Sequence, residues 1–216
     1  AMAIIDPTFT PAPAPATLRL GRVTCEADQP VQAALDAALS GVNAAIVPVE
    51  LPGLAEAFAA NIAIIGAETW AAFGYLTQSD AMGADVKARL LNASKVSQTQ
   101  QDEAEAVRQT FRAEVDAALA EVDALVLPTM PLFPLTLADA ADAAASLRMT
   151  ALVRPFNLSG HPALSIPIEA PNGLPVGVQL VGRIGGDEAL CAVARVLAEP
   201  LGANPRLFLQ EHMHAC

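Results

Sequence analysis

The sequence has few basic residues and no paired cysteines. Lys and Arg total 12 against 23 acidic residues, which gives a formal net charge of −11. Because nucleic-acid binding depends on clustered cations that contact phosphates, these few scattered cations argue against a nucleic-acid partner. The three cysteines, Cys25, Cys191 and Cys216, have neither metal-ligand nor paired spacing. This usage is typical of a reducing compartment, so we expect a cytoplasmic protein.

Long apolar runs and a signal sequence are also lacking. The chain is 53% hydrophobic, but alanine-rich helices account for much of that share. The most apolar window, 57–70, is interrupted by Asn61 and Glu68, so we expect a buried helix there rather than one of the roughly 20-residue apolar runs that cross membranes. No basic segment followed by an apolar core opens the chain. These absences predict no membrane partner.

The sequence does contain alternating strand and helix patterns. Residues 1–17 are rich in Pro and Ala and predict an extended leader, followed by one partial α/β domain over 18–216. Apolar periodicity predicts strands at 18–23, 44–49, 123–128, 163–168 and 176–181. Helices are expected from a cap at Asp28 to about 39, then at about 54–73, 85–94, 99–121 and 137–156, and from a cap at Asp187 to 198.

The order of these elements defines the fold class. The strand–helix–strand unit over 18–49 predicts a parallel strand pair with a right-handed crossover. The turn residues Pro171-Asn-Gly173 predict a hairpin between the last two strands. We therefore expect an α/β fold, in which a mixed β-sheet is flanked by helices.

Three motifs lie between Asp123 and Arg183. They are Asp123-Ala-Leu-Val-Leu-Pro-Thr129, Arg154-Pro-Phe-Asn-Leu-Ser-Gly-His-Pro-Ala-Leu-Ser-Ile-Pro167 and Gly173-Leu-Pro-Val-Gly-Val-Gln-Leu-Val-Gly-Arg183. In the second motif, a Gly and a Pro can turn the chain sharply from a helix into a buried strand. Together the motifs resemble the C-terminal half of an amidase signature hydrolase, and the resemblance extends from about residue 18 to about residue 209.

The resemblance implies an activity and a catalytic arrangement. The complete enzyme would hydrolyse a small-molecule carboxamide to a carboxylate and ammonia or an amine, without a metal or organic cofactor, by a Ser–cis-Ser–Lys arrangement in a Gly/Ser-rich segment. This sequence has no Gly-Gly-Ser-Ser run, and its only lysines are Lys87 and Lys95. Ser94 and Ser97 flank Lys95, but residues so close on a helix do not face each other. We assign no catalytic residue and expect this chain to be inactive alone.

The second motif also supplies candidate substrate-binding residues. The resemblance implies that this junction packs near the substrate cavity, so Phe156, Asn157 and His161 are candidates. The alternative is a purely structural junction. For His161, the sequence identifies no carboxylate partner, which favours a packed or hydrogen-bonded histidine over a catalyst.

Arg108 is the fourth candidate. Its helix resembles the one on which glutamine-using amidotransferases place an arginine that binds the substrate carboxylate, and a guanidinium can clamp a carboxylate with two parallel bonds. However, Thr150 stands where those relatives have an acidic residue, which argues against a glutamine site. The alternative is that Arg108 pairs with Glu105, three residues back on the same helix face.

Two further clusters resemble binding motifs. His212-Met-His-Ala-Cys216 offers three metal ligands, but a closed zinc site requires four. Gly182, Gly185 and Gly186 fit neither the dinucleotide-binding nor the P-loop spacing. We expect no metal site and no cofactor.

Three alternatives to an inactive amidase portion remain. The chain could be a standalone module that uses an exposed sheet edge for self-association or partner binding. It could also be one half of a split amidase or amidotransferase, or an enzyme with relocated chemistry around Arg108, His161 or the terminal His–Cys cluster. In either of the first two cases we expect a homo-oligomer or a complex with the missing N-terminal half.

Overall fold

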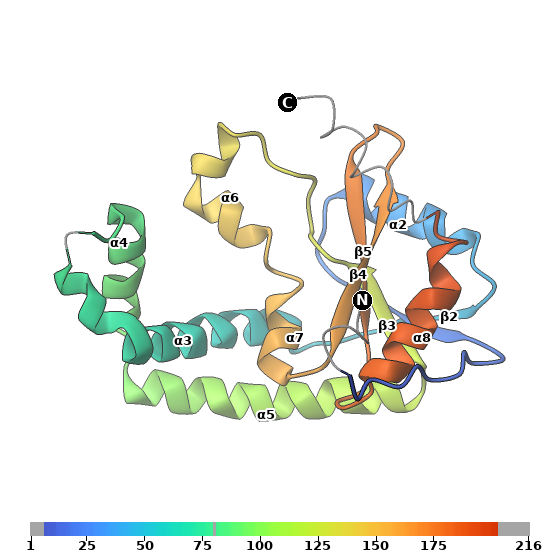
Figure 1. Ribbon diagram of the computed structural model, residues 1–216, viewed down its shortest axis with the longest axis horizontal. Helices are drawn as coiled ribbons and strands as arrows, with labels where there is room; N and C mark the ends of the chain where they lie inside the picture. The colour runs from blue at the N-terminus through green and yellow to red at the C-terminus, as the bar shows by residue number, and fades with distance from the viewer. Residues whose placement is uncertain (1–6, 80, 203–216) are drawn as a thin grey trace.

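The five apolar segments expected to be strands all form strands. They are β1 (Arg19–Val23), β2 (Ala45–Val49), β3 (Ala124–Pro128), β4 (Ala163–Glu169) and β5 (Pro175–Val181). In the computed structural model, which describes residues 7–79 and 81–202, they pair in the order β2-β1-β3-β5-β4 (Figure 1). β1 is parallel to β2 and β3, whereas β5 is antiparallel to β3 and β4. The predicted mixed sheet is therefore confirmed.

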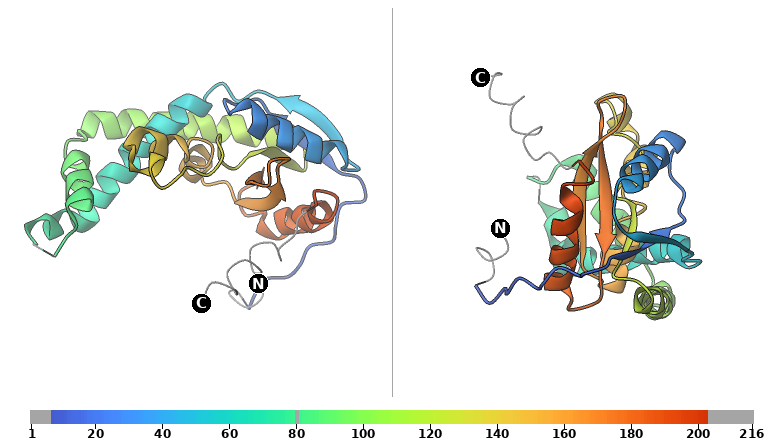
Figure 2. Two further views of the ribbon diagram at one scale, coloured as in Figure 1. Left: turned by 90° about the horizontal axis from the view of Figure 1, so that it is seen from above. Right: turned by 90° about the vertical axis from the view of Figure 1, so that its right-hand side faces the viewer.

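Most of the expected helices form within a few residues of their predicted bounds. They are α2 (Gln29–Ser40), α3 (Leu54–Phe73) with the 3-10 turn η1 (Gly74–Gln78), α4 (Ala84–Ala93), α5 (Gln98–Ala120) and α8 (Asp187–Ala198). Figures 1 and 2 show α3, α4 and α5 extending away from the sheet, with α4 at the far end.

The single helical stretch predicted over 137–156 is wrong. The chain instead forms η2 (Asp139–Ala141), α6 (Ala143–Arg148) and α7 (Arg154–Ser159), separated by turns. The side chain of Asp142 accepts a hydrogen bond from the Ala144 N–H and so starts α6. Pro155 lies in the first turn of α7, where its fixed φ and missing N–H are tolerated. Local capping chemistry therefore divides an alanine-rich segment that helix propensity alone would join.

The two aspartates expected to cap helices do not do so. Asp28 occupies the N-cap position of α2 but makes no side-chain cap bond, because its carboxylate pairs with Arg148 at 2.6 Å. Asp187 is the first residue of α8, and Gly186 is its N-cap. A capping box forms elsewhere, between Ser97 and Gln100 at the start of α5.

The sheet divides the core into two layers. Successive residues of a strand point to opposite faces, so Val126 and Leu180 face α2 and α8, whereas Leu125 and Leu127 face the other side. On that other side the core is completed by α3, α5 and α7. All five residues of β3 are buried, as the prediction of burial on both faces requires. Figure 2 shows α5 on one side of the β4 and β5 strands and α8 on the other.

Both free edges of the sheet carry a proline whose missing N–H faces outward. Ala45 and Val49 of β2 bond to β1 through their backbone, so Pro48 points away from it. On β4, the even-numbered residues direct their backbone N–H and C=O groups toward β5, as Pro162 just before the strand does by accepting from the Gly182 N–H. The odd-numbered Pro167 therefore faces the free edge. Proline at an edge interrupts the row of donors that strand addition requires.

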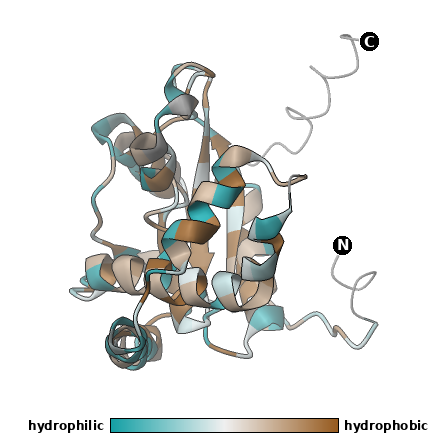
Figure 3. Ribbon diagram, turned by 90° about the vertical axis from the view of Figure 1, so that its left-hand side faces the viewer, coloured by the Kyte–Doolittle hydropathy of each residue, from teal (hydrophilic) through white to brown (hydrophobic). Residues whose placement is uncertain are grey.

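One helix of the described chain is apolar over an unusual length. The segment Leu54–Gln78, which comprises α3 and η1, is long and apolar enough to cross a membrane by length and composition, and the core helices of soluble proteins pass the same test. The expectation that no stretch reaches this length is therefore wrong. The buried helix expected there is also wrong, because only 22% of this apolar window is buried; the buried residues of α3 are Ala57, Ala60 and Asn61. In Figure 3, where α5 is viewed along its axis, the outward side of α5 is by contrast largely hydrophilic.

Candidate functional site

A cavity of about 670 Å³ lies beyond the carboxyl ends of β1 and β2. The β1–α2 loop contributes residues 24–26, and the β2–α3 loop contributes Leu51 and Pro52. The first turns of α3 and residues 144–152 of the α6–α7 region complete the wall. Ligands in open α/β sheets bind at this end of the strands, where the chain connections diverge to either side. The chain leaves β1 through α2 on one face of the sheet and leaves β2 through α3 and α5 on the other face.

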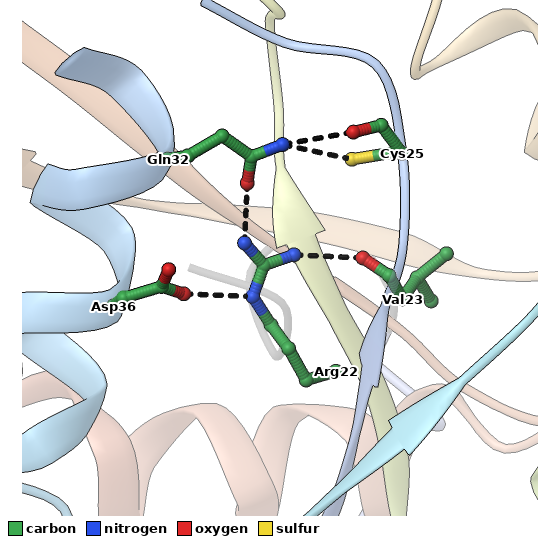
Figure 4. A network of polar contacts seen from close by, with 5 residues as sticks. All are labelled: Arg22, Val23, Cys25, Gln32 and Asp36. Carbon is green, nitrogen blue, oxygen red and sulfur yellow. Dashed lines mark hydrogen bonds and ion pairs between the residues drawn. The ribbon is translucent and has the colours of Figure 1, made fainter. Parts of the chain in front are cut away.

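A network centred on Arg22 holds the β1–α2 loop against α2 (Figure 4). The Arg22 guanidinium pairs with Asp36 at 3.0 Å, donates to the Val23 carbonyl at 2.7 Å and donates to the Gln32 side chain. Gln32 in turn donates to the Cys25 carbonyl at 2.8 Å. The strand, the helix and the cavity-lining Cys25 are thereby fixed relative to one another.

Of the residues that the structure describes, the one arginine that lines the cavity is compensated by an aspartate. Arg148 is paired with Asp28, and both side chains are about half exposed (52% and 43%). Burial raises the pKa of the Cys25 thiol, and the nearby Arg22 charge only partly opposes this effect. Cys25 is therefore a neutral thiol at physiological pH rather than an activated nucleophile.

Arg108 helps hold α7 in place from α5. Arg108 donates to the Leu158 carbonyl at 3.2 Å, and Arg112, one turn later, donates to the Ser159 carbonyl at 2.8 Å. The last carbonyls of a helix have no partner within it, and these two guanidinium groups satisfy them. Arg108 also pairs with Glu105 at 3.0 Å, which confirms the predicted ion pair.

His161 has a carboxylate partner that the sequence did not indicate. Its Nε2 lies 3.2 Å from Asp116 Oδ1 and its Nδ1 lies 2.9 Å from Ser159 Oγ. The sequence could not identify this partner, because Asp116 lies 45 residues away on α5 and only packing brings it near. The expected hydrogen-bonded histidine is confirmed.

Asp116, His161 and Ser159 are the residue types of a hydrolytic triad, but a substrate cannot reach the serine. Ser159 is fully buried, at 0% exposure, and its hydroxyl is also within 3.2 Å of the Phe156 carbonyl. A nucleophile must reach the carbonyl carbon of a substrate, which a buried serine cannot do. The three side chains therefore fasten the α7–β4 junction to α5.

The four predicted substrate-binding residues lie outside the wall of the large cavity. Phe156 is buried and packs against Phe111, with ring centroids 6.0 Å apart, whereas Asn157 is exposed. Arg108 lines a separate, smaller pocket of about 240 Å³ between α3 and α5. Their role in substrate binding remains a prediction.

Sequence reasoning missed the residues that line the large cavity. The parallel β1–β2 pair was predicted, and the loops after the carboxyl ends of such strands are where a site is expected. That rule alone would have indicated 24–26 and 51–52. The contribution of Leu147 and Leu152 depends on how α6 and α7 pack, which no local pattern in the sequence encodes.

The remaining candidate clusters are the group around Lys95 and the possible metal ligands. Lys95 donates to the Asn92 side chain at 2.9 Å and Ser97 caps α5, so this group forms a helix end. Within residues 7–79 and 81–202, no three His, Cys, Asp or Glu side chains are grouped to hold a metal ion. The His212–Cys216 cluster lies outside the described residues.

Comparison with known proteins identifies relatives of this chain. The family model described as Amidase matches residues 13–191. An uncharacterized protein in the nthA 5′ region of Rhodococcus erythropolis is 39% identical over 99 residues, which cover 44% of this chain and 50% of that protein. A glutamyl-tRNA(Gln) amidotransferase subunit of Archaeoglobus fulgidus is 28% identical over 140 residues, or 62% of this chain and 31% of that protein.

Solved structures agree on the fold. The crystal structure of a glutamyl-tRNA(Gln) amidotransferase subunit from Thermotoga maritima superimposes with a TM-score of 0.70 at 23% identity, covering 85% of this chain and 42% of that one. The matched region is thus half or less of the length of each of these relatives.

Proposed function

We propose that this chain, which belongs to the amidase family, forms the C-terminal part of a carboxamide hydrolase. In the complete enzyme, water would cleave the C–N bond of the amide and release a carboxylate together with ammonia or an amine. This chain would supply a wall of the substrate cavity. The nucleophile would come from a Gly/Ser-rich segment, either on the same longer polypeptide or on a separate one.

One observation carries this proposal. The Amidase match extends over residues 13–191, yet the sequence has no Gly-Gly-Ser-Ser run. Serine-based amide hydrolysis requires a nucleophile beside a base. Lys95, one of the two lysines, is bound to Asn92, and the neighbouring Ser97 is used as a helix cap. The described residues therefore support substrate positioning rather than bond cleavage.

The second candidate function is a binding or self-association module. It is favoured by Ile62 and Ile65, which are 36% and 46% exposed on α3 although large apolar side chains are usually buried. A cytoplasmic location is part of either proposal, because Cys25 and Cys191 are both free thiols.

An ammonia-release assay tests the proposed function. The purified chain, offered a panel of aliphatic and aromatic amides, should release no ammonia above the rate in buffer. A fusion in which a Gly/Ser-rich amidase segment precedes residue 18 should restore turnover. The matched control is the same fusion with its nucleophilic serine changed to alanine, which should be inactive.

Two results would contradict the proposal. The first is turnover by the unfused chain that survives rigorous purification, which would place the chemistry on its own residues. The second is a folded fusion that stays inactive on every amide tested, which would favour the binding module.

A further inference from the structure

We infer that the cavity beyond β1 and β2 receives the apolar acyl group of an uncharged carboxamide and excludes amides that carry a carboxylate, such as glutamine. This inference rests on the proposed function and names the substrate class of its site.

The cavity wall is mainly apolar. Leu51, Leu54, Phe58, Leu147 and Leu152 converge on it from two separate segments of the chain. Its volume of about 670 Å³ is within the roughly 300–1,000 Å³ that small-molecule sites occupy. An alkyl or aromatic acyl group would replace water against these side chains, which is favourable in proportion to the apolar area covered.

Among the described residues, no cation of the cavity is available to a substrate carboxylate. Arg148 is the one arginine in the wall, and its guanidinium is held by Asp28 at 2.6 Å. Glu26, also in the wall, adds a negative charge. A ligand carboxylate would lose its hydration without gaining a bidentate arginine partner, and such a transfer is costly.

The arginines near the cavity do not supply a positive charge for a substrate carboxylate either. Arg154 donates to Thr150 at 2.7 Å and to Asn61 at 3.3 Å, which binds it to the α6–α7 turn and to α3. Arg108 lines the smaller pocket between α3 and α5, which Glu68, Asp102 and Glu105 also line. Within the part of the chain that the structure describes, every buried side-chain polar atom already has a hydrogen-bond partner. In the cavity wall, the Thr24 hydroxyl donates to the Glu50 carboxylate at 2.7 Å.

Direct binding to the purified 216-residue chain tests the inference. Ligand-observed NMR titrations would use benzamide and hexanamide as apolar probes, with acetamide and glutamine as polar ones. Benzamide and hexanamide should bind, and glutamine should neither bind nor displace them. Leu147→Asp should weaken benzamide binding at least about tenfold, because it places a charge in the apolar wall.

Leu137→Asp is the matched control, because Leu137 is 97% exposed and lies outside the cavity wall. This variant should bind benzamide as the wild type does, and both variants should show the circular dichroism of the folded chain. Glutamine binding as strong as benzamide binding would overturn the inference, as would a folded Leu147→Asp variant with unchanged affinity.

The test separates this inference from the proposed function. Apolar amides that bind the chain, combined with an inactive fusion, would retain the ligand class and refute the hydrolase. An active fusion that hydrolyses glutamine as readily as hexanamide would retain the hydrolase and refute the ligand class.

Discussion

At the scale of single residues, His161 lies between groups from two elements. Burial lowers its pKa below the ordinary value, and the Arg112 charge acts in the same direction. Asp116 opposes both effects through its hydrogen bond and its charge. A neutral ring with its proton on Nε2 donates to Asp116, and its Nδ1 lies 2.9 Å from the Ser159 hydroxyl, whose single proton serves both this nitrogen and the Phe156 carbonyl.

We predict that His161 makes the fold sensitive to mild acid. The unfolded chain binds the histidine proton near pH 6.5, whereas the folded chain binds it only at lower pH. Stability is therefore fully present above pH 6.5 and decreases as pH falls from there through the folded-state pKa. Urea midpoints measured between pH 7.5 and about 5 should decrease for the wild type and decrease less for His161→Gln.

The difference between the wild type and His161→Gln isolates the contribution of His161 to the pH dependence of stability. Burial raises the pKa of Glu114, an effect of opposite sign that is present in both proteins and cancels in the difference. Equal acid sensitivity of the wild type and His161→Gln would contradict the prediction.

At the scale of elements, the junction between α7 and β4 depends on one backbone conformation. Gly160 ends α7 in the left-handed region, with φ of 77°, while its N–H bonds the Phe156 carbonyl. The side chains of Arg108, Arg112 and Asp116 recur every four residues, so they share one face of α5 and contact this junction in turn. A short helix of six residues is thus held by a long one.

We predict that Gly160→Ala destabilises the protein by about 2 kcal/mol, since a non-glycine residue in the left-handed region costs about 1–2 kcal/mol. In addition, the new methyl group would lie 3.0 Å from Arg112 Nη2 and disturb its bond to Ser159. Gly173→Ala is the control, because φ there is 78° but nothing lies within 4 Å. Urea denaturation should show a smaller loss for Gly173→Ala, of about 1 kcal/mol. Equal losses would rule out the contact with Arg112 as a contributor.

At the scale of the whole molecule, α3 presents an apolar stripe next to the cavity. Phe58, which lines the cavity, is followed at four- and seven-residue spacing by Ile62 and Ile65, so the three share a helix face. The edges of the sheet are less suited to association, because Pro48 and Pro167 interrupt their outward donors. We therefore propose α3 as the surface that joins another chain, as an alternative to the sheet edge predicted from the sequence.

We predict that the chain forms a dimer or larger oligomer and that Ile62→Asp with Ile65→Asp shifts it to a monomer in sedimentation velocity. Both side chains are partly exposed, so the double variant should remain folded. Val196→Asp on α8 is the control, because Val196 is 39% exposed and belongs to the opposite layer. A wild type that sediments as a monomer at all concentrations would contradict the prediction.

The sequence predicted the strands and the long helix well but not the segment between β3 and β4. The strands at 123–128 and 163–181 and the long helix at 98–120 were predicted, because their periodicity and turn residues are local signals. The 137–156 region was not, since Asp142 and Pro155 divide it by capping chemistry that competes with alanine propensity. For the site, the sequence identified junction residues but not the cavity, whose walls come from segments about 100 residues apart.

The sequence by itself determined the α/β class, the strand order along the chain and the motifs of the amidase family, because each of these is encoded in contiguous residues. Tertiary structure alone decided what the polar side chains do. It placed Asp116 beside His161, tied Arg108 and Arg112 to α7, and paired Arg148 with Asp28 across 120 residues. Such pairs depend on which surfaces meet when the helices pack on the sheet, and local periodicity carries no information about that meeting.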